Sequence, residues 1–303
     1  MKDLVAVSRE VADALGHRRP VVALETTLVA HGFPAGEGLE VGRECERRVR
    51  EVGAVPATVG VLYGAVRVGL SDAELERIAE AGPDAHKAGP RDLAVCAVQG
   101  AVGATTVGGT LAACRIAGIG FMGTGGIGGV HRGFAELPDV SADLAELARV
   151  EVLVVSSGAK SLLDVRATAE LLETLGVPVL GWRTDELPLF YSARGGPPVS
   201  ARVETAEEAA RIARAHWRLG RRCALVLARP PEDGVEDVEP LIEEALAEAR
   251  ARGVAGQAVT PFVLSFLHER SGGRTLEVNK RLIADNAALA AEVAVAYARL
   301  GWP

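Results

Sequence analysis

The sequence predicts an α/β fold in which a mainly parallel central sheet is flanked by helices on both faces. Two observations favour this class. Short apolar runs, typical of buried strands, alternate with amphipathic stretches whose apolar residues recur at helical spacing. In addition, no linker, internal repeat or low-complexity segment divides residues 1–303. We therefore expect a single domain built around one sheet.

The strands are predicted from apolar runs that are short enough to cross a sheet once. The sequence leaves the order of these strands open. The runs are VVAL (21–24), ATVGVLY (57–63), GIGFMG (118–123), VEVLVVSS (150–157), VPVLGW (177–182) and CALVLA (223–228).

The helices are predicted from the stretches between these runs, and two have recognisable ends. Ser71 followed by Glu74 at the third helical position is the pattern of a capped helix start. Gly176, which precedes an apolar run, marks a helix end. The main loop is expected at 192–205. The helical stretches are 38–52, 71–82, 160–176, 205–220, 238–253 and 276–301, the last being one long helix or two that pack on the body or on a neighbouring subunit.

Charge and cysteine content exclude several classes of protein. Lys and Arg total 33 and Asp and Glu total 40, so the net charge is 33 − 40 = −7, and no basic block suggests a nucleic acid polymer as partner. The four cysteines form no CxxC pair, which favours free thiols in a reducing compartment such as the cytoplasm. No signal peptide is expected at the N-terminus, and no run approaches the ~18 apolar residues of a membrane helix.

A dense glycine run, GTGGIGGVHRG (123–133), directly follows an apolar run. Glycines let backbone amides approach a ligand closely, and successive amides can form a site for an anion. The run matches neither the P-loop nor the dinucleotide pattern. A tight turn is the alternative, although the flanking His131 and Arg132 favour an anion. His131 taken alone is more often a structural residue than a catalyst.

Glu25 immediately follows the first apolar run. In open α/β sheets, ligands bind beyond the carboxyl ends of the strands. A carboxyl group there can be partly desolvated, which raises its pKa and suits a general acid. A helix cap or an exposed strand end is an equally good interpretation of its position.

Lys160 follows another apolar run and is expected to start a helix. Desolvation and the positive end of that helix would both lower its pKa, and a neutral amine can form a Schiff base with a sugar aldehyde. Position alone somewhat favours an exposed lysine in a first helical turn.

Other charged residues have structural interpretations that compete with functional ones. Lys87 lies beside Arg91 and Asp92, where a solvated surface is the better interpretation. Ser141 is expected to cap a helix, with Asp143 in its first turn. A spare carboxylate in this segment could hold Mg²⁺ or Mn²⁺ weakly through water. Neither a cluster with metal-ligand spacing nor a GxSxG motif is present, which argues against a tight metal cage and a serine hydrolase.

Taken together, these segments resemble the pseudouridine-5'-phosphate glycosidase family from about Pro20 to the C-terminus. No single motif decides the resemblance, but the order and spacing of many motifs agree. The matching stretches are 21–34, 53–70, 103–119, 124–133, 139–148, 158–164, 172–178, 260–279 and 285–294.

The resemblance implies a role for individual residues and an assembly. Glu25 stands at the position of the family's proton donor, Lys160 at that of its nucleophile, and Asn279 at that of an asparagine near the reacting centre. Asp139 aligns with the ligand of a single Mn²⁺ per subunit, and the family's members are homotrimers of one α/β domain. The residues that align with substrate-contacting or pocket-shaping positions are Lys87, Val107, Thr124, His131, Ser141, Ala142 and Asp143.

This sequence also departs from the family's pattern. Gly89 and Pro90 stand where the family has serine and arginine, and Arg229 replaces an asparagine. Ser156 and Ser157 precede GAKS where a cysteine is common. These departures bear on fine substrate contacts, whereas every position implied to be catalytic is intact.

The implied reaction is reversible cleavage of pseudouridine 5'-phosphate to uracil and ribose 5-phosphate, through ring opening and a Lys160 Schiff base. The substrate is thus a small molecule, and neither a nucleic acid polymer nor a membrane is a partner. Two alternatives stay open: a Schiff-base aldolase or lyase acting on another phosphosugar, and a non-catalytic sensor of phosphosugars or nucleotides. The presence of both Glu25 and Lys160 disfavours the sensor.

Overall fold

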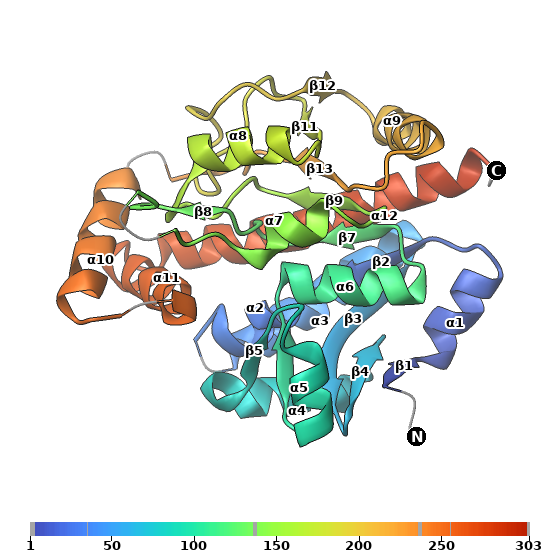
Figure 1. The fold of residues 1–303 in the computed structure, drawn as a ribbon, viewed down its shortest axis with the longest axis horizontal. Helices are drawn as coiled ribbons and strands as arrows, with labels where there is room; N and C mark the ends of the chain where they lie inside the picture. The colour runs from blue at the N-terminus through green and yellow to red at the C-terminus, as the bar shows by residue number, and fades with distance from the viewer. Residues whose placement is uncertain (1–3, 35, 136–137, 236–237, 255, 302–303) are drawn as a thin grey trace.

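A mainly parallel sheet runs through the centre of the molecule (Figure 1). The computed structural model describes residues 4–34, 36–135, 138–235, 238–254 and 256–301. The apolar runs predicted to be strands all form strands. The ends of these strands differ from the ends of the runs by at most three residues. The strands are β1 (Val5–Val7), β2 (Val21–Leu24), β3 (Val55–Leu62), β4 (Ala65–Val68), β5 (His86–Ala88), β6 (Gly103–Thr105), β7 (Phe121–Gly123), β8 (Val130–His131), β9 (Leu153–Ser156), β10 (Leu163–Asp164), β11 (Val179–Trp182), β12 (Ala201–Val203) and β13 (Leu225–Ala228).

The order of the main path through the sheet is β1-β4-β3-β2-β7-β9-β13-β11-β12, with β6 paired to β3 and β5 paired to β6. The pairings of β3 with β4 and with β6 are antiparallel, and the other pairings in this sheet are parallel. All four residues of β2 and of β9 are buried, because helices cover both faces of a parallel sheet. The fold class is therefore confirmed as a single-domain α/β fold.

The helices also largely follow the sequence pattern. Ser71 forms the expected capping box with Glu74, and the long C-terminal stretch forms one continuous helix. The helices are α1 (Arg9–Gly16), α2 (Thr27–His31), α3 (Glu37–Val52), α4 (Asp72–Ala81), α5 (Leu93–Gln99), α6 (Val107–Ala117), α7 (Ala142–Leu147), α8 (Val165–Thr174), α9 (Ala206–Arg218), α10 (Glu239–Ala251), α11 (Val259–Arg270) and α12 (Arg274–Arg299).

Two sequence expectations are corrected. Lys160 does not start a helix, because the side chain of Asp164 accepts a hydrogen bond from the Ala167 amide and α8 begins only at Val165. The segment 192–205 is not entirely a loop, because β12 lies within it. β12 is an edge strand that pairs with β11 alone and exposes two of its three residues, so it lacks the apolar pattern of a buried strand.

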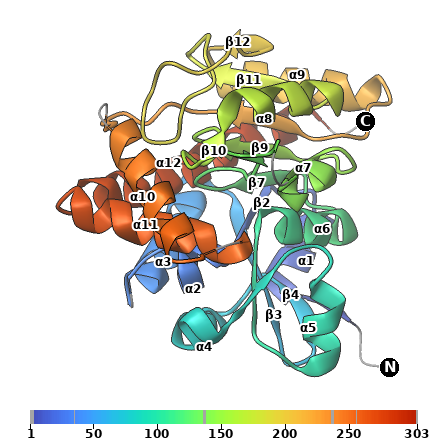
Figure 2. The ribbon, with the colours of Figure 1, turned by 60° about the vertical axis from the view of Figure 1, so that its left-hand side comes forward.

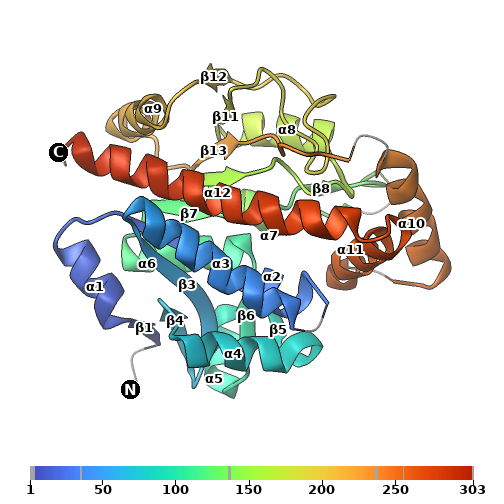
Figure 3. The same ribbon diagram turned by 180° about the vertical axis from the view of Figure 1, so that it is seen from behind.

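Helices pack on both faces of the sheet. Figure 3 shows α12 crossing one face, with α3 beside it, and α12 contacts β2, β7 and β9. Helices α6, α7 and α8 lie on the opposite face (Figure 1). The pair α10 and α11 lies at one end of the molecule, beside the start of α12 (Figure 2). Among the residues described, no helix has the length and apolar character needed to cross a membrane.

The topology determines where a site can form. β2, β7 and β9 are adjacent and parallel, so their carboxyl ends meet at the same edge of the sheet. Glu25, Thr124 and Ser157 directly follow these three strands. The four cysteines lie elsewhere, in the core, as buried free thiols.

Candidate active site

Four residues from distant segments line one small cavity at this edge of the sheet. Glu25 follows β2, Lys160 follows β9, Lys87 lies in β5 and Asn279 in α12, and all four line a cavity of about 50 Å³. The acid and the amine that the sequence singled out are therefore brought together. In this arrangement the Lys160 charge acts on the carboxyl of Glu25 and on the amine of Lys87.

The carboxyl group of Glu25 is almost completely buried. Burial raises its pKa, while the positive charge of Lys160 and a hydrogen bond from Thr124 Oγ1 to Glu25 Oε1 oppose the rise. A carboxyl group with a raised pKa retains its proton at higher pH, as a general acid must. The sequence expectation of a desolvated carboxyl at a strand end is confirmed.

Lys160 is half-buried in the turn between β9 and β10. Its backbone amide donates to the Ile127 carbonyl at 3.0 Å, and its carbonyl accepts from the Leu163 amide at 3.0 Å. These bonds fix the backbone from which the side chain enters the cavity. α8 begins only at Val165, beyond this turn, so Lys160 does not lie in the first turn of a helix.

Lys87 is not the solvated surface lysine that its sequence position favours. It is half-buried in β5, and burial lowers its pKa to about 8, with the positive charge of Lys160 adding to this effect. The charges of Asp143 and Glu25 oppose the shift. The site therefore holds a second amine beside Lys160, and the pKa of this second amine, on Lys87, is about 8.

A second cavity, of about 340 Å³, adjoins the first and shares Lys87, Lys160 and Thr260 with it. Gly89 and Pro90, two of the departures from the family's pattern, also line it. The sequence-predicted residues on its wall are His131, Asp139, Ser141, Ala142 and Asp143.

Asp143 joins the elements that form this second cavity. Its two carboxylate oxygens accept hydrogen bonds from the amides of Gly108 at 2.7 Å and Gly128 at 2.8 Å. Ser141 caps α7, as expected, by accepting from the Asp143 amide at 3.2 Å. Asp143 thus connects α7 to the start of α6 and to the glycine-rich segment.

Five amides of the glycine-rich segment 123–133 are bonded within the protein and are not free to bind an anion. The amides of Thr124, Ile127, Val130 and His131 donate to protein oxygens, and that of Gly128 donates to Asp143. The anion-nest interpretation is therefore wrong for these amides. The glycines instead permit close packing, since a Cβ on Gly126 would come within 2.7 Å of the Phe190 ring.

Two predicted residues lie behind the cavity walls. Val107 is completely buried in the core at the start of α6. Thr124 is 1% exposed, and its hydroxyl is directed at Glu25. Thr124 therefore acts on the acid, whereas Val107 lines neither of the two cavities.

The residues around Asp139 fit a weakly held cation better than a closed metal cage. The Asp139 carboxylate lies 3.9 Å from Nδ1 of His131, whose pKa is lowered by burial. Within the part of the chain that the structure describes, no group of three His, Cys, Asp or Glu side chains is placed to hold a metal ion. One partly exposed carboxylate beside a neutral imidazole suits a hard cation completed by water or by a ligand.

Several other residues of the first cavity had no signal in the sequence. Phe33, Phe190, Leu264 and Ile283 form an apolar wall that comes from four separate segments. The predicted Asn279 also lines this cavity. Asn279 is 3% exposed, and its Oδ1 finds no hydrogen-bond partner among the described residues. An unpaired buried amide in a cavity is a contact site for a ligand.

Comparison with known proteins identifies the family. Residues 10–296 match the family described as indigoidine synthase A like protein. A pseudouridine-5'-phosphate glycosidase of Deinococcus radiodurans is 48% identical over 96% of this chain and 94% of its own length. One from Sorangium cellulosum is 46% identical, covering 99% of this chain and 96% of its own, and one from Escherichia coli is 43% identical, covering 98% and 97%.

Solved structures agree over the whole fold. The prealnumycin C-glycosynthase AlnA, solved in complex with ribulose 5-phosphate, has a TM-score of 0.90 and 40% identity, and 99% of each chain is covered. An indigoidine synthase A-like protein of Thermotoga maritima has a TM-score of 0.86 and 38% identity, with 96% of each chain covered. The chain therefore belongs to the pseudouridine-5'-phosphate glycosidase family of indigoidine synthase A-like proteins.

Proposed function

We propose that this enzyme reversibly cleaves pseudouridine 5'-phosphate to uracil and ribose 5-phosphate through a Schiff base on Lys160. The names of the relatives suggest the substrate. The observation that supports the chemistry is the shared cavity, in which a buried carboxyl group with a raised pKa faces lysine amines. An acid and an amine nucleophile are what ring opening of a sugar requires.

The first step opens the ribose ring. Glu25 gives its proton to the ring oxygen as the C1'–O bond breaks, and the uncharged Lys160 nitrogen bonds to C1'. The Glu25 carboxylate then takes up the proton that this nitrogen loses. Ring opening is necessary because the base is attached through carbon, so protonation of a nitrogen leaving group is not available.

The second step breaks the bond to the base. The uracil carbon takes up the proton that Glu25 holds after the first step, and the C1'–C bond breaks as the Lys160 lone pair forms a C1'=N iminium. Water then adds to C1' and releases ribose 5-phosphate, which regenerates the amine and returns a proton to the Glu25 carboxylate. Covalent catalysis by Lys160 thus divides one difficult step into easier ones.

In this proposal the first cavity holds the base and the adjoining cavity holds the phosphate. The unpaired Oδ1 of Asn279 and the apolar wall with Phe33 and Phe190 suit a flat polar base. Lys87, with His131 and Ser141 in the adjoining cavity, suits the phosphate. A Mn²⁺ ion at Asp139, one per subunit, would add positive charge beside that phosphate.

Reductive trapping tests this proposal. The enzyme incubated with pseudouridine 5'-phosphate and borohydride should gain the mass of a reduced ribose phosphate, and peptide mapping should locate it on Lys160. Lys160→Ala should release no uracil yet still bind substrate. Lys280→Ala, which removes a surface lysine paired with Glu37 and Glu277, is the matched control and should retain the adduct. Normal turnover by Lys160→Ala would contradict the proposal.

A related activity is favoured by one observation. The AlnA relative is named a C-glycosynthase and was solved with ribulose 5-phosphate, and Gly89 and Pro90 alter the wall of the second cavity. A lyase acting on another phosphosugar would also form the Lys160 adduct, but it would release no uracil. A sensor would bind the phosphosugar with neither adduct nor turnover.

We further propose that the enzyme works in the cytoplasm as a homotrimer. The buried free thiols suit a reducing compartment. Light scattering should give three times the chain mass of 31.5 kDa. A monomer mass at micromolar concentration would contradict the trimer.

A further inference from the structure

Asn286 is a buried polar side chain to which neither the sequence nor the mechanism assigns a task. It lies on α12, is completely buried, and is two helical turns beyond Asn279. Residues seven apart lie on nearly the same face of a helix, so both amides face the carboxyl ends of the strands.

The amide of Asn286 joins the segments that follow two neighbouring strands. Its Nδ2 donates to the Thr124 carbonyl at 2.9 Å and to Ser157 Oγ at 3.1 Å, and the Gly125 carbonyl lies 3.5 Å away. Thr124 follows β7, and Ser157 follows β9. The Ser157 amide donates to the Gly125 carbonyl at 2.8 Å, so the two segments are also bonded to each other.

Thr124 links Asn286 to the carboxyl group of Glu25. Its amide donates to the Val155 carbonyl at 3.0 Å, its carbonyl accepts from Asn286, and its hydroxyl donates to Glu25. With both ends of the residue fixed, the hydroxyl approaches Glu25 from a single direction. Removal of the Asn286 donor would free the Thr124 carbonyl and leave it buried without that partner.

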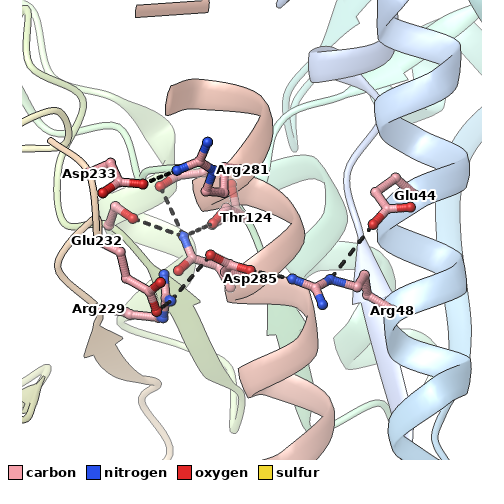
Figure 4. Close-up of polar contacts among 11 residues, drawn as sticks. Glu44, Arg48, Thr124, Arg229, Glu232, Asp233, Arg281 and Asp285 are labelled. Atoms are coloured by element: carbon pink, nitrogen blue, oxygen red, sulfur yellow. Dashed lines mark hydrogen bonds and ion pairs between the residues drawn. The ribbon is translucent and has the colours of Figure 1, made fainter. Parts of the chain in front are cut away.

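Close packing and ion pairs fix the position of Asn286 along the axis of helix α12. A Cβ on Gly123 would lie 2.8 Å from the Ala287 Cα atom, so the helix rests directly on the strand end. Figure 4 shows the neighbouring Asp285 between two arginines. Arg229 contacts one carboxylate oxygen at 3.2 Å, and Arg48 of α3 contacts the other.

We infer that Asn286 is a positioning residue for the acid of the reaction. Through Thr124, its amide sets the orientation of the Glu25 carboxyl group toward the sugar, although Asn286 touches neither the substrate nor Glu25. This inference rests on the proposed function, in which Glu25 is the proton donor.

The test compares three variants by their rate profiles against pH. Asn286→Leu keeps the size of the side chain and removes its donors. It should lower kcat at least about tenfold with little change in KM, because misplacement of a catalytic group by a fraction of an ångström slows chemistry. It should also move the alkaline limb of the kcat profile to higher pH. The hydrogen bond from Thr124 lowers the pKa of Glu25, and Lys160, Lys87 and Asp143, which also act on this carboxyl, are unchanged.

Asp285→Asn is the matched control. It weakens the ion pairs of the adjacent residue on the same helix and leaves the amide of Asn286 in place. It should lower the thermal midpoint without moving the alkaline limb. Thr124→Val, which removes the hydroxyl and keeps Asn286, should reproduce the shift of that limb even if Asn286→Leu folds poorly.

The outcomes separate this inference from the function on which it rests. The positioning role would be overturned if the alkaline limb of the kcat profile moved no further in Asn286→Leu and Thr124→Val than in Asp285→Asn. A wild-type enzyme that releases no uracil and forms no adduct would overturn the proposed function instead. An additive shift in the Asn286→Leu, Thr124→Val double variant would show that Asn286 does not act through Thr124.

Discussion

The raised pKa of Glu25 suits a general acid but lowers the stability of the folded protein at neutral pH. In the folded protein its carboxyl keeps a proton over a pH range in which the unfolded chain, with a pKa near 4.5, has released it. The folded state therefore loses stability as the pH rises from that value through the raised pKa. At a pH above the raised pKa, each unit by which folding raises the pKa of Glu25 lowers the free energy of unfolding by about 1.4 kcal/mol.

Glu25→Gln should consequently abolish turnover and stabilise the protein at neutral pH. The thermal midpoint of the variant should exceed that of the wild type at pH 8 and approach it at pH 4, as scanning calorimetry can measure. Glu46→Gln is a matched control, because burial also raises the pKa of that carboxyl away from the site. It should gain stability and keep its activity. A lower midpoint for Glu25→Gln at pH 8 would contradict this account of the acid.

Lys87 makes a second prediction, which concerns substrate capture. With a pKa of about 8 it loses its charge as the pH rises through that value, so its attraction for a phosphate should weaken. We expect kcat/KM of the wild type to fall above pH 8. Lys87→Arg should extend the plateau, because a guanidinium stays charged at this pH. A wild-type kcat/KM that is the same at pH 7 and pH 9.5 would exclude an ionic role for Lys87.

The segment from β7 to β8 shows why its glycines matter to the elements around it. A Cβ on Gly128 would lie 2.2 Å from Ser141 Oγ and 2.7 Å from Asp143 Oδ2. Gly128→Ala should therefore displace the start of α7, which carries residues of the second cavity. Such overpacking costs about 1–3 kcal/mol, and kcat/KM should fall at least tenfold.

The control for this element lies at the other end of β7. A Cβ on Gly120 would meet nothing closer than the Glu151 carbonyl at 3.9 Å. Gly120→Ala should change the free energy of unfolding by less than about 0.5 kcal/mol and leave the kinetics unchanged. Equal activity of the two alanine variants would show that close contact at Gly128 is not needed for the site.

Across the whole molecule, α12 connects both halves of the sheet to α3. Its Asp285 carboxylate is 14% exposed and pairs with Arg229, whose side chain is 10% exposed. Removal of Asp285 leaves Arg229 paired with Glu232 at 2.7 Å, so the loss should be smaller than the about 3–5 kcal/mol that breaking an isolated buried pair typically costs. Arg48 is more exposed, so its contact with Asp285 should contribute less.

Asp285→Ala should therefore lower the thermal midpoint by several degrees, whereas the Arg229→Leu, Asp285→Leu double variant should recover part of the loss. Denaturant unfolding of the single and double variants measures the coupling between the two residues. Additive effects would mean that the pair contributes nothing to the attachment of α12. Arg229, which departs from the family's pattern, would then have only a local role.

Much of the fold followed from local patterns. Apolar runs such as 21–24 and 223–228 form strands because each is apolar along its whole length, as burial on both faces requires. Ser71 and Gly176 mark helix ends through local hydrogen bonds and backbone conformation. Edge strands such as β12 escaped prediction, since exposure removes the apolar signal.

The sequence by itself determined the fold class and the order of the elements, and it located the acid Glu25 and the amine Lys160 at the ends of apolar runs. Only the tertiary structure decided that Glu25, Lys87, Lys160 and Asn279 share one cavity. It also decided that five amides of the glycine-rich segment bond within the protein, and that Asn286 reaches Thr124. The physical reason is that secondary structure arises from neighbours in the chain. The site instead depends on strand order and helix packing, which join residues as far apart as Thr124 and Asn286.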